Sequence, residues 1–180
     1  MANVVVVLLR GVNVGGHNKI RMESLRDLCA GLGLENPRTH IQSGNIIVGT
    51  SEKDLAIVGK RIQKAIEDNL TVRCEVILRT PKDLREIIAR NPFKDRTDVT
   101  PNKLCVMFLA GEPGPQVKEN IRKLLVGPEE LHIDGRDLYI YFPNGAGQSK
   151  LPALLDRALK MPATARNWNT VMKLLALAED

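Results

Sequence analysis

Two short runs of apolar residues constrain the fold of this 180-residue chain more than any other feature. Val4–Leu9 is apolar at every position, and so is Leu104–Leu109. A strand with one face in water alternates apolar and polar residues, so an unbroken run predicts a central strand that is covered on both faces. We therefore expect two antiparallel-containing sheets, each built around one of these runs.

The pattern after each run predicts two similar halves. The first half reads strand, helix, strand, strand, helix, strand, which is the ferredoxin-like order. After the first run its expected elements are helices at 22–32 and 55–66, and strands at 38–42, 45–48 and 73–79. The second half repeats strand-helix-strand-strand-helix and is expected to end in an extra C-terminal helix, about 167–178, without a final strand. The fold class is thus α+β, with two similar ferredoxin-like halves and mainly antiparallel sheets.

Local signals set the expected domain limits. Residues 80–83 (Thr-Pro-Lys-Asp) predict a further helix start, with Thr80 as the cap, Pro81 at the first position and Asp83 reaching back. The two prolines and mixed charges of residues 91–102 predict a linker. We expect a first half at 1–90 and a second at 103–180.

The connection between the first strand and the first helix, 10–22, is the most distinctive stretch. It carries three glycines, two asparagines, one histidine, one lysine and two arginines, and no carboxylate. Backbone N–H groups and cations that converge in such loops bind anions. Three further stretches, 36–51, 138–155 and 157–178, also lack Asp and Glu, which favours anionic ligands.

The ferredoxin-like topology places this loop beside the turn at Ser43, because the first and second strands run parallel with the third between them. The ligand-binding residues expected here are Arg10, Asn13, Gly15, Gly16, His17, Lys19, Gln42, Ser43 and Asn45. If the site is catalytic, His17 is the natural acid or base, with His40 second. The alternative for each asparagine is that it satisfies backbone groups in a turn.

Two later motifs add ligand-binding predictions. Residues 143–150 join a strand to a helix, and there Ser149 and Lys150 resemble a phosphate loop in chemistry without matching the Walker pattern. Arg166 and Asn167 precede the last helix, and an arginine at such a position can bind an anion or donate to a backbone carbonyl. Trp168 is the only tryptophan, and its expected role is packing.

Four motifs in the chain are distinctive when taken together. They are Arg10-Gly11-Val12-Asn13-Val14-Gly15-Gly16-His17-Asn18-Lys19, Gln42-Ser43-Gly44-Asn45, Pro143-Asn144-Gly145-x-Gly147-x-Ser149-Lys150-Leu151 and Thr164-x-Arg166-Asn167-Trp168-Asn169-Thr170. In this order they resemble a bacterial protein family, domain of unknown function 1697. The resemblance implies an α+β protein of two similar halves and no established activity. Gln148 stands where a basic residue is expected, which removes one phosphate contact.

Several classes of chemistry are disfavoured by the sequence. No His, Cys, Asp and Glu cluster has metal-ligand spacing, so we expect no metal and no cofactor. The candidate site lacks the paired carboxylates of a glycosidase, and no Ser-His-Asp signature occurs. No apolar run approaches the ~20 residues of a membrane helix, and no signal-peptide pattern is present. We therefore expect a cytoplasmic protein with no membrane partner.

Three functions stay open on the sequence alone. The first is binding of a small anionic ligand, such as a nucleotide or phosphorylated metabolite, with or without catalysis. The second is a nucleic-acid-binding module, but the net charge is only +5 and aromatic residues are 3% of the chain, so nucleic-acid binding is expected to be weak or absent. The third is a structural or protein-interaction domain, in which a homodimer could cover the apolar strands.

The first prediction concerns the three cysteines, Cys29, Cys74 and Cys105, which are far apart and lie in apolar patterns. We expect all three to be reduced thiols. A thiol titration of fresh protein under denaturing conditions should count three, and elemental analysis should find no stoichiometric zinc. A lower thiol count would contradict this reading.

Overall fold

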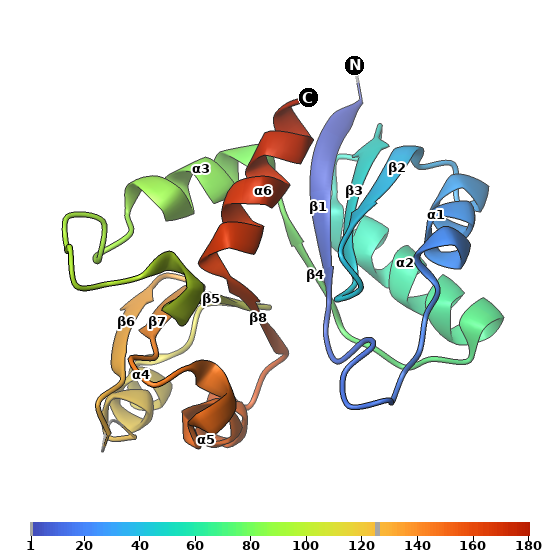
Figure 1. Ribbon diagram of the computed structural model, residues 1–180. Helices are drawn as coiled ribbons and strands as arrows, with labels where there is room; N and C mark the ends of the chain where they lie inside the picture. Colours follow the sequence, from blue (N-terminus) through green and yellow to red (C-terminus); the bar gives the residue numbers. More distant parts are fainter. Residues whose placement is uncertain (1, 125–126) are drawn as a thin grey trace. The chain divides into compact units, whose positions relative to one another are not determined.

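The computed structural model describes residues 2–124 and 127–180 (Figure 1). The chain forms two compact units: unit 1 comprises Met1–Arg85 and Leu174–Asp180, and unit 2 comprises Glu86–Lys173. The unit boundaries lie inside two helices, α3 (Pro81–Ala89) and α6 (Trp168–Glu179). The domain limits expected from the sequence stay a prediction, because compactness does not test whether each half folds by itself.

Unit 1 contains a four-stranded antiparallel sheet in the order β2-β3-β1-β4. Its strands and its first two helices are β1 (Asn3–Leu9), α1 (Met22–Gly31), β2 (Glu35–His40), β3 (Asn45–Thr50), α2 (Leu55–Leu70) and β4 (Val76–Arg79). Because β3 pairs antiparallel with both β1 and β2, those two strands run parallel to each other. The ferredoxin-like order expected for this half is confirmed.

The core of unit 1 lies between its sheet and the helices α1 and α2, which cover one face of the sheet (Figure 1). Val5, Val7 and Leu9 of β1 point into this core, where Leu25 of α1 and Ile62 of α2 are also fully buried. The intervening side chains of β1, including Val6 and Leu8, are equally inaccessible. The prediction that this strand is covered on both faces is therefore confirmed.

Unit 2 contains a second antiparallel sheet, in the order β6-β7-β5-β8. Its elements are η1 (Pro101–Lys103), β5 (Leu104–Leu109), α4 (Pro115–Arg122), β6 (Glu130–Asp134), β7 (Asp137–Tyr141), η2 (Ala146–Gln148), α5 (Leu151–Leu159) and β8 (Ala163–Asn167), followed by α6. Val117, Ile121, Leu124 and Leu125 have the spacing of a helix, and the last of them lies outside the described residues.

The strand β8 corrects the prediction that the second half ends without a strand. Its sequence, Ala-Thr-Ala-Arg-Asn, has no run of large apolar residues, so no strand pattern was visible. It pairs with the buried strand β5 through the backbone, and its side chains Thr164 and Arg166 are buried although polar. Strand prediction from hydrophobic periodicity assumes that buried positions are apolar, so it does not detect a strand whose buried residues are polar.

With β8 in place, the two halves share both element order and strand register. Val6 of β1 is paired with Arg79, and Val106 of β5 is paired with Arg166. The strands β4 and β8 are each followed directly by a helix, α3 and α6 respectively. The architectural repeat is therefore strand-helix-strand-strand-helix-strand-helix, which is longer than expected from the sequence.

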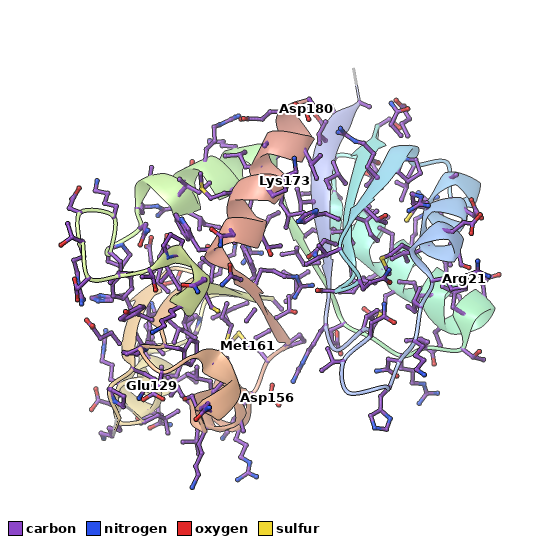
Figure 2. All side chains as sticks on the ribbon, in the orientation of Figure 1. Arg21, Glu129, Asp156, Met161, Lys173 and Asp180 are labelled. Atoms are coloured by element: carbon purple, nitrogen blue, oxygen red, sulfur yellow. The ribbon has the colours of Figure 1, made fainter. Side chains whose placement is uncertain are left out.

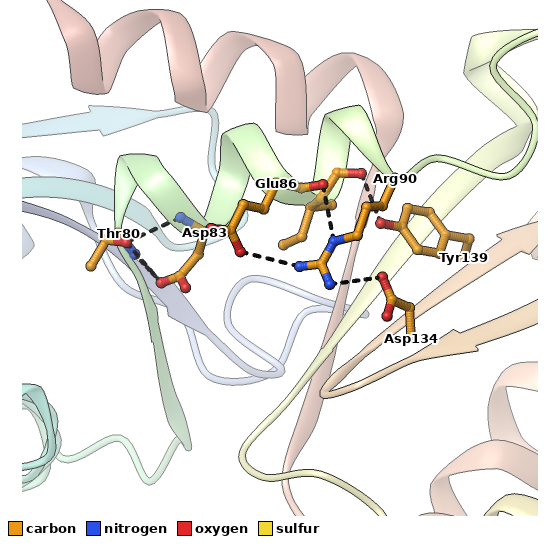
Figure 3. Close-up of polar contacts among 7 residues, drawn as sticks. Thr80, Asp83, Glu86, Arg90, Asp134 and Tyr139 are labelled. Atoms are coloured by element: carbon orange, nitrogen blue, oxygen red, sulfur yellow. Dashed lines mark hydrogen bonds and ion pairs between the residues drawn. The ribbon is translucent and has the colours of Figure 1, made fainter.

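Helix α3 begins with the expected cap (Figure 3). The backbone N–H of Thr80 donates to Asp83 Oδ2 over 2.7 Å, and the Asp83 N–H donates to Thr80 Oγ1 over 3.1 Å. At the other end of the helix, Arg90 forms an ion pair with Asp134 at 3.4 Å. The reciprocal bonds at Thr80 satisfy N–H groups that have no partner within a helix.

The segment expected as a linker packs on the β6–β7 hairpin of unit 2. Phe93 is buried and lies edge-on to the ring of His132, with 5.2 Å between ring centroids. Arg96 pairs with Glu130 at 2.6 Å and lies over the Phe93 ring. These contacts give residues 91–100 fixed partners in a compact unit, although their composition is typical of a loop.

The second prediction tests the close approach of the β2–β3 turn to β1. Gly44 has φ +72°, and a Cβ there would lie 2.8 Å from the Leu9 Cβ. Gly44→Ala should lower the free energy of unfolding by about 2 to 4 kcal/mol, through left-handed strain and overpacking.

Gly11→Ala is the matched control, because Gly11 also has positive φ but a Cβ there meets nothing within 4 Å. It should cost only about 1 to 2 kcal/mol. Equal losses in urea unfolding would show that the contact with Leu9 is unimportant.

Candidate functional site

The connection between β1 and α1 folds as a small hairpin, which we call the finger loop (residues 10–21). The Asn13 N–H donates to the Asn18 carbonyl over 3.1 Å, and the His17 N–H donates to the Val14 carbonyl over 3.0 Å. Between them, Gly15 and Gly16 have φ of +58° and +81°. Two successive positive φ values define a type I′ turn, which explains both glycines by local geometry.

Asn13 holds the finger loop against the β2–β3 turn. Its Nδ2 donates to the carbonyls of Gln42, at 2.7 Å, and Ile20, at 3.0 Å, while its Oδ1 accepts the Ile20 N–H at 2.9 Å. The two loops predicted to be neighbours do lie together. However, both side-chain N–H groups of Asn13 are occupied by backbone partners, which favours a structural role for this residue.

The remaining predicted residues of this region differ in exposure. Asn45 is fully buried and donates to the His40 carbonyl over 3.0 Å, again a structural contact. His17, Lys19 and Gln42 are exposed, whereas Ser43 and His40 are half-buried. Exposed cations on a carboxylate-free loop can meet an anion, but these residues alone define no cavity.

A pocket of about 390 Å³ lies beside the finger loop, where β1 ends and β4 begins. We call it the finger pocket. Its lining residues are Arg10, Gly11 and Asn18 of the finger loop, Gln63 and Glu67 of α2, and Arg73, Cys74 and Glu75 of the segment before β4. Of the ligand-binding residues predicted from the sequence, Arg10 alone is among them. Asn13, Lys19 and Asn45, which were expected to converge with Arg10, do not line this pocket.

The electrostatics of the finger pocket are mixed. Arg73 Nε lies 2.6 Å from Glu67 Oε1, and both side chains reach solvent. The Arg10 N–H donates to the Glu75 carbonyl over 3.0 Å, which fixes the end of β1 against the segment before β4. Burial, with a smaller contribution from the Glu75 charge, raises the pKa of the Cys74 thiol to about 11. Cys74 is therefore a protonated thiol near neutral pH and a poor nucleophile.

Arg73, Glu67 and Glu75 were not among the residues predicted from the sequence. Residues 73–75 were assigned to a strand, and Glu67 belongs to an ordinary amphipathic helix. One signal was available: in the ferredoxin-like order the fourth strand pairs antiparallel with the first. Residues just before β4 must therefore lie beside residues just after β1.

In the predicted phosphate-like loop at 143–150, Ser149 already has a carboxylate partner from outside the loop. Ser149 Oγ donates to Glu129 Oε1 over 2.5 Å and accepts the Leu151 N–H at 3.0 Å. The Glu129 carboxylate thus lies close to the start of α5, where an external anion was expected. Lys150 is exposed, and Lys103 donates to the Pro143 carbonyl over 2.5 Å.

Arg166 and Asn167 are held by backbone and side-chain partners within unit 2. Arg166 donates to Thr164 Oγ1 over 2.7 Å and to the Ala165 carbonyl over 2.8 Å, and burial lowers the pKa of its guanidinium to about 10. The Asn167 amide donates to the Asn102 carbonyl over 2.9 Å. Both residues therefore have structural contacts that explain them without a ligand.

Other chemistry finds little support in the described part of the chain. Among those residues no group of three or more His, Cys, Asp or Glu side chains is placed to hold a metal ion. The cysteines are free, and burial raises the pKa of Cys29 to about 12 and that of Cys105 to about 11. No helix within 2–124 or 127–180 has the length and apolarity needed to cross a membrane.

The tyrosines that a nucleic-acid surface would need are buried. Tyr139 is 1% exposed and its hydroxyl donates to the Ile87 carbonyl over 2.7 Å (Figure 3). Tyr141 is 7% exposed and donates to the Asp98 carbonyl over 3.1 Å. Neither ring offers a free face on which a base could stack.

The fold and the pocket together define an α+β protein with two four-stranded antiparallel sheets and a polar pocket in its first unit. The chain belongs to the family of proteins of unknown function called DUF1697, whose profile matches residues 2–139. The matched residues include the finger loop and the β2–β3 turn. The motifs at 143–151 and 164–170 lie beyond them.

One solved structure supports the fold. A conserved bacterial protein from Streptococcus pneumoniae is similar over 100% of both chains, with a TM-score of 0.74 and 20% sequence identity. A protein provisionally assigned as a chlorite dismutase is 12% identical over 98% of this chain and 99% of that one, but its TM-score of 0.30 is too low to indicate a shared fold. No curated protein matches the chain.

The third prediction tests the structural role of Asn13. Asn13→Ala removes three hydrogen bonds and leaves the partly buried Ile20 N–H without its acceptor, so it should lower the free energy of unfolding by about 1 to 3 kcal/mol beyond any backbone strain.

Asn18→Ala is the control, because Asn18 also has positive φ but its amide makes one exposed bond, to the Gly11 carbonyl. Its loss of stability in urea should be smaller by about 1 kcal/mol or more. Equal losses would argue that Asn13 does not anchor the finger loop.

Proposed function

We propose that unit 1 binds a small ligand through an anionic group in the finger pocket. The observation that carries this proposal is the pocket itself, because two arginines, Arg10 and Arg73, are among the residues that line it. A volume of about 390 Å³ falls in the usual range for small-molecule sites, roughly 300 to 1,000 Å³. Guanidinium groups bind carboxylates and phosphates through paired N–H donors.

The surroundings of the pocket favour attraction of an anion. Residues 1–22 and 36–51 contain no Asp or Glu. Lys19 and His17 are exposed on the finger loop, and Lys19 forms no ion pair with any described residue. Such charges raise the local concentration of anions over roughly 10 Å at physiological salt.

Comparison of the two units supports a function for this loop beyond folding. The finger loop spans residues 10–21, whereas its counterpart between β5 and α4 spans only 110–114. The backbone bond from Arg10 to Glu75 has an equivalent from Ala110 to Pro162. The same backbone geometry is thus built without charged side chains in unit 2, so folding does not require them.

The ligand class proposed is a nucleotide or a phosphorylated metabolite, in a cytoplasmic protein. Catalysis is not part of the proposal, because the finger pocket holds no activated nucleophile and the exposed His17 is not among its lining residues. The nucleic-acid alternative is weaker, since Tyr139 and Tyr141 are buried.

The fourth prediction is a ligand-dependent rise in melting temperature. A panel of nucleotides, sugar phosphates, coenzymes and short RNA should contain at least one compound that stabilises the protein. A ligand at 100 times its Kd adds about 2.7 kcal/mol. Arg10→Ala should abolish the shift, and Lys19→Ala should reduce it by weakening the local field.

Lys53→Ala is the matched control, because Lys53 is exposed but follows β3, at the opposite end of the same sheet. It should leave the shift unchanged. If no compound alters the melt, or if the shift survives Arg10→Ala combined with Lys19→Ala, the proposed site is wrong.

A further inference from the structure

We infer that the ligand of the finger pocket carries an ammonium group as well as an anionic group. This inference rests on the proposed function and adds the chemistry of the second group. Its basis is that the pocket contains Glu67 and Glu75 together with Arg10 and Arg73. Two carboxylates and two guanidinium groups give the lining no net formal charge.

A purely anionic ligand does not match such a lining. Whatever attraction it gains from Arg10 and Arg73 is opposed by repulsion from Glu67 and Glu75 within the same small volume. In a ligand that carries both charges, the anionic group can face the arginines and the ammonium group can face the glutamates, so contacts between like charges are avoided. The carboxylates therefore act as a selectivity element against simple anions.

The ion pair between Arg73 and Glu67 is suited to exchange with such a ligand. The side chains are 89% and 47% exposed, so the pair gains little in water and is easily opened. When the ligand's anionic group pairs with Arg73, Glu67 is released to accept the ammonium. Arg73 and Glu67 then each keep a partner of opposite charge.

Glu75 supplies the second carboxylate on the same wall. It directly follows Cys74, which lines the pocket, and its charge contributes to the raised pKa of the Cys74 thiol. The Glu75 carbonyl is bound by the Arg10 N–H over 3.0 Å, so the two residues lie side by side at the backbone level. One wall thus offers a cation and an anion next to each other.

The fold does not demand a carboxylate at this position. In unit 2 the equivalent of Glu75 is Pro162, because Leu9 is paired with Val76 and Leu109 with Ala163. The proline carbonyl accepts the Ala110 N–H in the same way. A simpler explanation is that the acidic residues only hold the segment before β4 in place. It can account for Glu67, which pairs with Arg73. It does not account for the Glu75 carboxylate, because the contact with Arg10 uses the Glu75 backbone carbonyl.

Matched pairs of probes test the inference by isothermal titration calorimetry. Phosphoethanolamine and ethyl phosphate differ only in the ammonium group, and so do glutamate and glutarate. In the unmodified protein, the ammonium-bearing member of at least one pair should bind tenfold or more tightly. In Glu67→Gln combined with Glu75→Gln, that ratio should fall to about one, because the ammonium has lost its partners.

Glu23→Gln is the control, since Glu23 also forms an exposed ion pair, with Arg21, but does not line the pocket. It should keep the tenfold ratio. The single variants Glu67→Gln and Glu75→Gln provide the same readout if the double variant does not fold, and each should reduce the ratio.

The outcomes separate the two proposals. Equal binding within both pairs, or a ratio that survives in the glutamine variants, overturns the ammonium inference and leaves the anion site standing. Failure of all four probes, together with an unchanged melting panel, overturns the proposed function and this inference with it. A selective ratio that is lost in the glutamine variants, together with weaker binding of both members of the pair to Arg10→Gln, supports both.

Discussion

The structure depends on the complete burial of two central strands, β1 and β5. Each is hydrogen-bonded on both edges, and Val5–Leu9 and Val106–Leu109 are almost inaccessible to solvent. A strand buried in this way can tolerate little movement, because its neighbours fill the space on all sides. The residues that follow β1 directly, Arg10 and Gly11, are therefore placed by the core, and a site on a rigid element is more precise than one on a free loop.

Most of the fold could be predicted because its elements follow local rules. The apolar runs identified the central strands, helical spacing identified α1 and α2, and the Thr80 to Asp83 cap marked the start of α3. The strand β8 could not be predicted from pattern, because its buried Arg166 is satisfied by Thr164 Oγ1 and a backbone carbonyl. Such compensation depends on partners that are fixed only in three dimensions.

Less of the candidate site than of the fold could be predicted from the sequence. The composition of the finger loop predicts an anion site, which stays a prediction, but the side-chain amides of Asn13 and Asn45 donate to backbone carbonyls. Composition cannot separate an asparagine that holds a turn from one that contacts a ligand, because both need the same donors. Arg73, Cys74 and Glu75, which line the pocket with Arg10, come from the segment just before β4, about sixty residues later in the sequence, and only the topology places them beside Arg10.

The two units provide an internal comparison that separates the demands of folding from those of binding. Asn45 and Asp137 occupy equivalent positions at the start of the middle strand, paired with Leu8 and Phe108, and both are buried. Arg79 and Arg166 are likewise equivalent and buried. Polar residues that recur at equivalent buried positions are explained by the shared architecture. The charged residues Arg10 and Glu75 have the uncharged equivalents Ala110 and Pro162 in unit 2. The shared architecture therefore does not explain their charges, whereas the ligand proposed for the finger pocket would.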